Sequence, residues 1–190
     1  LAALGDGQVT AAGPRGPNEL NVSVSHAGKR IPAVFQVRTA DAARKEVAAY
    51  RLDRQLGLGI VPVTVEREVQ GQRGVLQGRP VKWVSQTEVQ QQQLRGGGWC
   101  STEPQFQLVY AFDTLIGNEG RTPKSLPAYL KARPPTPGAE LRRRVAALDE
   151  ENLATSLGEL VDAKGRKAIL QRRDVLLALP AAASAAAKSP

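Results

Sequence analysis

Apolar and polar positions alternate through the first part of the chain, and this pattern predicts strands. Within residues 21–38, Val22 and Val24 alternate with serines, a turn centred on Gly28 follows, and a second apolar run comes next. Side chains of a strand point to opposite faces in turn, so this alternation is typical of a half-buried strand. We therefore expect a hairpin here, with residues 31–36 forming a strand of an N-terminal sheet.

A helix is expected between this hairpin and two further strands. Residues 42–56 are rich in strong helix formers, with Asp41 as the expected N-cap and Gly57 as the residue that ends the helix. Residues 60–68 and 73–77 then predict two strands joined by a short turn. The predicted order is strands, one helix packed against the sheet, and more strands.

Helical periodicity dominates the second half of the chain, after a polar stretch rich in Gln and Gly. Helices are expected at residues 105–116, 140–148, 150–160 and 163–179. The whole pattern predicts an α+β fold. Its expected parts are an N-terminal sheet-plus-helix lobe over 1–85, a flexible joint over 86–104, a helical C-terminal lobe over 105–179 and a frayed tail over 180–190.

Composition narrows the class of protein without indicating an activity. Hydrophobic residues at 42% and charged residues at 23% are usual for a globular chain. Cys100 is the one cysteine, so no disulfide forms within the chain, and no stretch reaches the roughly 18 apolar residues of a membrane span. We therefore expect a soluble protein. Because the chain does not begin with Met, we expect a processed or truncated product, either cytoplasmic or exported after loss of a signal.

The charge balance is basic, with 26 Lys and Arg against 18 Asp and Glu and a net charge of +8. This charge suits an acidic ligand or protein partner. It does not favour a nucleic-acid interface, because the densest basic cluster, Arg142 to Arg144, has no aromatic neighbour to stack on bases. His26 is the one histidine, so neither a zinc site nor a Ser–His pair is expected.

Three segments resemble one family. Residues 45–68 (KEVAAYRLDRQLGLGIVPVTVERE) resemble the Glu-containing helix and following strand of bacterial kinase-like proteins related to HipA-type and phosphoinositide lipid kinases. Residues 112–118 (FDTLIGN) resemble the helix that leads into their catalytic loop, and residues 148–177 resemble their closing helices. The resemblance implies a bacterial protein with a two-lobed, protein-kinase-like fold and a nucleotide site.

The implied phosphate-binding pair is altered in this chain. Where the family has a Lys at the end of a strand, this chain has Gln36, and Glu46 matches the helix carboxylate that pairs with that Lys. A hydrogen bond between Gln36 and Glu46 would be weaker than a charge-assisted one. The alternative for Glu46 is an exposed carboxylate paired near Lys45 or with Arg51. Trp83, near the implied hinge between lobes, is a candidate to line an adenine pocket, and the alternative is a buried packing role.

A glycine-rich phosphate loop is implied near the N-terminus. Gly13 and Gly16 lie in a turn-rich link over residues 13–17, which follows a short predicted strand over residues 8–12. Prolines in this link stiffen it and remove backbone N–H donors that could bind phosphate.

The catalytic loop is the most altered part. The family pattern resembles Gly-Asn-x-Asp-Arg-His-x-x-Asn, whereas residues 117–125 read GNEGRTPKS. Arg121 is retained, Gly120 replaces the Asp, and Glu119 is a candidate carboxylate one position early. The metal-binding Asp that follows this loop in the family has no counterpart, because Leu126 is followed directly by residues 127–130, which resemble the region beyond it, so no metal ligand is assigned.

These departures predict a degenerate kinase-like (pseudokinase) module that binds or scaffolds a partner, with weak or no phosphotransfer. Such a module requires no cofactor, and ATP would bind weakly and largely without magnesium. Two alternatives stay open. One is an active atypical kinase that uses Glu119 or a segment missing after Leu126, and the other is a basic protein that binds nucleic acid or an anionic surface through charge alone.

Overall fold

The computed structural model describes residues 2–79, 92, 102–118 and 136–180. They form two compact units, which we call the first and the second unit. The first unit consists of residues 2–79 and the segment Thr155–Asp162, and the second of residues 102–118, 136–154 and 163–180. The described residues contain one five-stranded antiparallel sheet and six α-helices, so the fold is α+β as predicted.

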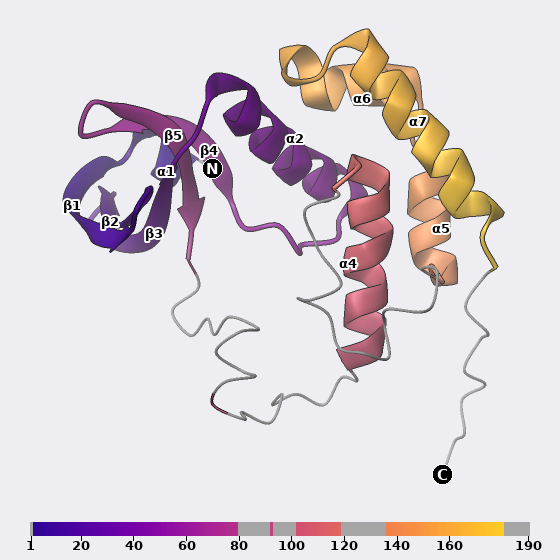
Figure 1. Ribbon diagram of the computed structural model, residues 1–190, viewed down its shortest axis with the longest axis horizontal. Helices are drawn as coiled ribbons and strands as arrows, with labels where there is room; N and C mark the ends of the chain where they lie inside the picture. Colours follow the sequence, from indigo (N-terminus) through magenta and orange to yellow (C-terminus); the bar gives the residue numbers. More distant parts are fainter. Residues whose placement is uncertain (1, 80–91, 93–101, 119–135, 181–190) are drawn as a thin grey trace. The chain divides into compact units, whose positions relative to one another are not determined.

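The first unit is built around the sheet, in which the strand order is β1-β2-β3-β5-β4. Figure 1 shows that the strands curl strongly around one face and that α2 follows β3. The elements of this unit are α1 (Ala2–Asp6), β1 (Gln8–Gly16), β2 (Glu19–His26), β3 (Lys29–Val37), α2 (Ala40–Leu56), β4 (Thr64–Val69) and β5 (Gln72–Gly78). The short helix α1 was not predicted from the sequence.

The predicted hairpin is confirmed as β2 and β3. Val22 and Val24 of β2 and Phe35 of β3 are buried on the inner face of the curled sheet. The turn between the strands has positive φ at Ala27 (49°) and Gly28 (72°), which Gly tolerates without steric penalty. The alternation of apolar and polar positions therefore predicted both strands correctly.

The prediction of a turn-rich link over residues 13–17 is wrong. β1 continues through Gly16, so Gly13 and Gly16 lie in a strand, and the turn to β2 consists of Pro17 and Asn18. Pro14 is tolerated because β1 is an edge strand among the described residues, and one side of its backbone pairs with none of the strands described. The register of β1 against β2 shifts twice, once on each side of its centre.

The helix α2 ends where expected and begins two residues earlier. Its N-cap is Thr39, whose Oγ1 accepts a hydrogen bond from the Ala42 N–H at 3.3 Å, whereas Asp41 lies in the first turn and pairs with Lys45. Gly57 ends the helix in the left-handed conformation. α2 contacts β4 and β5, which confirms that the helix packs against the sheet.

The connection from α2 to β4 is held by a buried carboxylate. Asp53 is fully buried, and its Oδ1 accepts a hydrogen bond from the Ile60 N–H at 3.0 Å. Its Oδ2 forms an ion pair with Arg54. The predicted strand over residues 60–68 is therefore wrong at its start, because Ile60 is tied to α2 and β4 begins only at Thr64.

The strands β3 and β5 approach each other closely at Gly74. A Cβ atom at this position would lie 2.0 Å from the carbonyl oxygen of Gln36. Only glycine fits without a shift of the backbone.

The described part of the second unit is helical. Its helices are α4 (Thr102–Ile116), α5 (Ala139–Ala146), the start of α6 (Glu150–Leu157) and α7 (Ala163–Ala178). In Figure 1, α4 and α5 run beside α7. α6 ends in the first unit, where the short 3₁₀-helix η3 (Gly158–Leu160) follows it. The four helices predicted in this half of the chain are confirmed, the third as α6 and η3 together.

Arginines of the second unit are largely engaged within it. Arg142 donates to the carbonyl oxygens of Leu177 and Leu179 at the end of α7, the latter at 2.8 Å. Arg143 and Arg144 each lie 2.7 Å from a carboxylate oxygen of Glu140. The hydrogen bonds from Arg143 and then Arg144 lower the pKa of Glu140 to about 2. The basic cluster is thus partly neutralised by its own helix.

Candidate functional site

The candidate site begins where β3 leads into α2. β3 ends at Val37, and only Arg38 and the N-cap Thr39 separate it from the first residue of α2. Glu46 lies in the second turn of α2. This short connection brings Glu46 back to the end of β3, so a strand side chain and a helix side chain meet there.

Arg38 joins the strand to the helix. Its Nε donates to Glu46 Oε1 at 2.6 Å, and the two side chains are 31% and 32% exposed. Its Nη2 donates to Gln36 Oε1 at 2.8 Å, and its Nη1 donates to the Val37 carbonyl at 3.1 Å. All three guanidinium nitrogens therefore have an acceptor within the protein.

The hydrogen bonds continue across the sheet toward β1. Gln36 Nε2 donates to Glu19 Oε1 at 2.8 Å, and Arg15 Nε donates to Glu19 Oε2 at 3.2 Å. The strand register explains this continuity, because Glu19 is directly opposite Gln36 on β3 and opposite Gly16 on β1. Neighbouring positions in a ladder place side chains within reach of one another.

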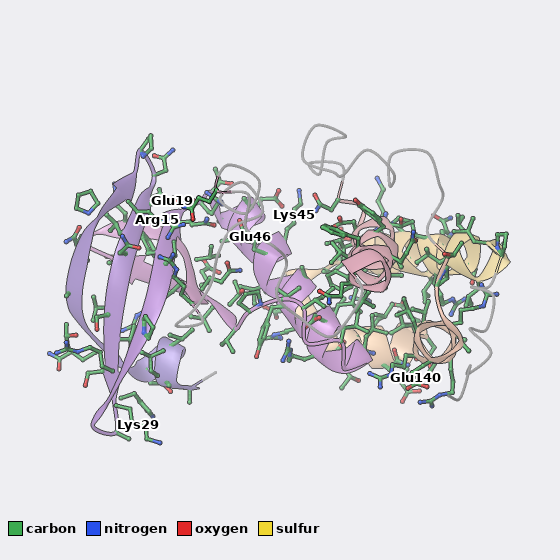
Figure 2. The ribbon with its side chains drawn as sticks, turned by 90° about the horizontal axis from the view of Figure 1, so that it is seen from below. Arg15, Glu19, Lys29, Lys45, Glu46 and Glu140 are labelled. Carbon is green, nitrogen blue, oxygen red and sulfur yellow. The ribbon has the colours of Figure 1, made fainter. Side chains whose placement is uncertain are left out.

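We call the connected side chains the polar row: Arg15, Glu19, Gln36, Arg38 and Glu46. Figure 2 shows Arg15 and Glu19 at the end of the sheet that lies toward Glu46, whereas Lys29 lies at the opposite end. The polar row thus crosses three strands and reaches the helix.

The polar row carries no formal net charge, since two arginines face two glutamates. Its members are partly exposed, so water competes for each contact and each ion pair is individually weak. An anionic ligand arriving here would find each arginine already bonded to a carboxylate. The arrangement suits a rigid polar surface better than a strong phosphate site.

Three of the predicted site residues are brought together. Gly16, Gln36 and Glu46 lie at the same end of the first unit, and Gln36 and Glu46 are linked through Arg38 instead of bonding directly. Gly13 lies farther along β1, opposite Asn21. The alternative partners for Glu46, near Lys45 or at Arg51, are not the ones it bonds, because Arg38 holds it.

The remaining predicted site residues, Trp83, Glu119 and Arg121, lie outside the described residues. The last described residue before the candidate catalytic loop is Asn118. Its Nδ2 donates to Asp113 Oδ1 at 2.9 Å, and its backbone N–H donates to the Asp113 carbonyl at 2.8 Å. The side chain and the backbone N–H of Asn118 therefore both bond to the last turns of α4.

Sequence reasoning missed Arg38, which is the centre of the polar row. A signal was present, because residues two apart in a strand lie on the same face, so a cation two positions after Gln36 is within reach of the same helix carboxylate. Glu19 and Arg15 carried no comparable signal, since their place beside Gln36 follows from the register of β1, β2 and β3.

The chain matches no family model, no curated protein and no solved structure. Among the residues that the structure describes, no helix is long and apolar enough to cross a membrane. The same residues contain no group of three or more His, Cys, Asp or Glu side chains that could hold a metal ion.

Proposed function

We propose that the protein is a degenerate kinase-like module that binds or scaffolds a partner and has weak or no phosphotransfer activity. The observation that carries this proposal is the state of Arg38. Three of its five N–H groups donate to Glu46, Gln36 and the Val37 carbonyl, and its charge is paired with Glu46, so its capacity to hold a nucleotide phosphate is reduced.

The order of elements supports the kinase-like part of the proposal. The resemblance implies a sheet with one internal helix followed by helices, and α2 lies between three strands and two strands, with helices after them. The ion pair between Glu46 and Arg38 supports it further, because the resemblance implies a cation paired with this helix carboxylate. The cation is supplied two residues later than expected.

The acidic member of the polar row supports the degenerate part. Glu19 places a carboxylate beside Gln36, close to where the resemblance implies bound phosphates. Like charges within a few ångström repel, and the repulsion is less screened at a partly buried site than in bulk water. Nucleotide affinity should therefore be weak.

Calorimetric titration of the full chain with ATP, with and without magnesium, tests the proposal. We expect weak binding that magnesium changes little, because Gly120 replaces the Asp of the family's catalytic loop and the metal-binding Asp that follows it has no match in this chain. Glu19→Gln should tighten ATP binding several-fold by removing the repelling charge. Glu68→Gln is the matched control, since Glu68 is an exposed carboxylate on β4 and should have no effect.

Incubation with labelled ATP and candidate acceptors tests the activity itself. We expect no transfer of labelled phosphate by the unmodified chain. The double change Gln36→Lys with Gly120→Asp should improve nucleotide binding and still give no turnover, because the groups of a phosphotransfer site act as a unit. Tight, magnesium-dependent binding together with transfer that Glu119→Gln abolishes would show an active kinase and contradict the proposal.

A further inference from the structure

A segment from the second half of the chain packs on α2. Thr155–Asp162 belongs to the first unit although it follows α2 by about a hundred residues in the sequence. The hydroxyl of Ser156 donates to Gln55 Oε1 at 2.5 Å, and the Ser156 carbonyl accepts from Arg51 Nη1 at 3.5 Å. These contacts attach the segment to the C-terminal half of α2.

Leu160 of this segment lies at the joint between α2 and the sheet. Its half-buried side chain packs against a cluster formed by Ala43 and Val47 of α2 and Val75 of β5. All three cluster residues are buried, and Val75 has no exposed surface at all. One leucine therefore contacts the helix and the sheet at the same place.

This cluster adjoins both sides of the link that Arg38 makes. Glu46 lies between Ala43 and Val47 along the same turn of α2. Val75 is directly opposite Gln36 in the ladder between β3 and β5. Leu160 thus connects α2 to the sheet through apolar contacts, and Arg38 connects α2 to the sheet nearby through hydrogen bonds.

We propose that Leu160 is a positioning residue for the ion pair between Arg38 and Glu46. By packing between α2 and β5, Leu160 fixes the distance between the helix and the sheet. This distance allows Glu46 Oε1 to lie 2.6 Å from Arg38 Nε. A partly exposed ion pair is weak and depends on geometry, so it cannot hold the helix against a loss of packing. The inference rests on the proposed function only in its meaning for ligand binding, since the proposed function places the ligand at the polar row.

A double-mutant cycle tests the inference in the full chain. Arg38→Gln and Glu46→Gln are made singly and together, and their coupling is read from urea unfolding as a ratio of equilibrium constants. We expect a coupling of about fivefold in the unmodified background. With Leu160→Ala the ratio should fall to about one, which means no coupling. With Leu160→Met, which conserves the side-chain volume, the coupling should return.

The control deletes a similar side chain from the other core cluster. Ile31 is partly buried and packs on the inner face of the sheet, so Ile31→Ala should destabilise the protein yet leave the coupling between Arg38 and Glu46 unchanged. This comparison separates positioning from a general loss of stability.

Undiminished coupling in Leu160→Ala would overturn the inference, as would an equal loss of coupling in Ile31→Ala. If Leu160→Ala does not fold, the milder Leu160→Val is used in the same cycle, with hydrogen exchange of α2 as a second measurement. Relative to the unmodified chain, amide exchange should then speed up more in α2 than in β1. Unchanged exchange in α2 would contradict the inference. The cycle requires no nucleotide, so failure to bind ATP would contradict the proposed function alone.

Discussion

The pair formed by Asp53 and Arg54 gives the sharpest test of the fold of the first unit. Asp53 is fully buried, whereas the side chain of Arg54 is 45% exposed. Besides the ion pair, Arg54 donates to the Val61 carbonyl at 3.0 Å and lies over the ring of Tyr50. Because only one partner is withdrawn from water, the two single substitutions should differ in their effect on stability.

Removal of the arginine should be the more damaging change. Arg54→Ala leaves the Asp53 carboxylate buried and without its cation, and loss of one partner of a buried pair costs about 3–5 kcal/mol. Half of Arg54 already faces water, so we expect the lower end, about 3 kcal/mol. Asp53→Asn keeps an oxygen for the Ile60 N–H and leaves an arginine that water can solvate, so about 1–2 kcal/mol is expected.

The double variant makes the argument decisive. With Asn at position 53 no charge is buried, so Asp53→Asn combined with Arg54→Ala should be more stable than Arg54→Ala alone. Urea unfolding followed by circular dichroism gives the free energies, and hydrogen exchange at the Ile60 amide reports the local change. Arg44→Ala is the matched control, because Arg44 is exposed on the same helix and should change stability by less than about 0.5 kcal/mol.

Two results would refute this reasoning. If Arg54→Ala were as mild as Arg44→Ala, the carboxylate of Asp53 would not depend on its neighbour. If the double variant were less stable than Arg54→Ala, the buried charge would not be the cause of the loss.

Two further predictions concern a glutamate and a glycine. Because the pKa of Glu140 is lowered from its ordinary value of 4.5 to about 2, its ion pairs should stabilise the fold fully above pH 4.5 and be lost as the pH falls to about 2; the stability difference from Glu140→Gln should follow this course, and an NMR titration midpoint near 4.5 would contradict it. Gly74→Ala should lower the free energy of unfolding by about 1–3 kcal/mol because of the contact with the Gln36 carbonyl. Gly13→Ala is its control, since a Cβ there meets nothing within 4 Å, and equal losses in both would refute the steric argument.

Local patterns predicted the central elements of the first unit well. β2, β3 and α2 follow from alternation, helix formers and Gly57, all of which act within a few residues. β4 was predicted too early because residues 60–63 have an apolar strand-like composition. Their conformation depends on a hydrogen bond from Ile60 to the buried Asp53, which no local pattern reveals.

The candidate site was only partly predictable for a similar reason. Gln36 and Glu46 were found by resemblance, and Arg38 was missed because the resemblance implies a cation at the position of Gln36, two residues earlier. Glu19 became part of the site through strand register, which the sequence specifies only through the whole hairpin. Side chains that meet across strands are therefore harder to predict than those within one element.

The irregular edge strand β1 has a consequence for the behaviour of the protein at high concentration. An open sheet edge offers unpaired backbone groups to which a second molecule can add a strand, the first step of aggregation. Pro14 offers no N–H, and the two register shifts interrupt the even spacing that such pairing requires. At the other edge, β4 exposes Glu66 and Glu68, whose like charges would face those of a second copy. Both edges of the sheet are thus poor templates for joining one molecule to the next.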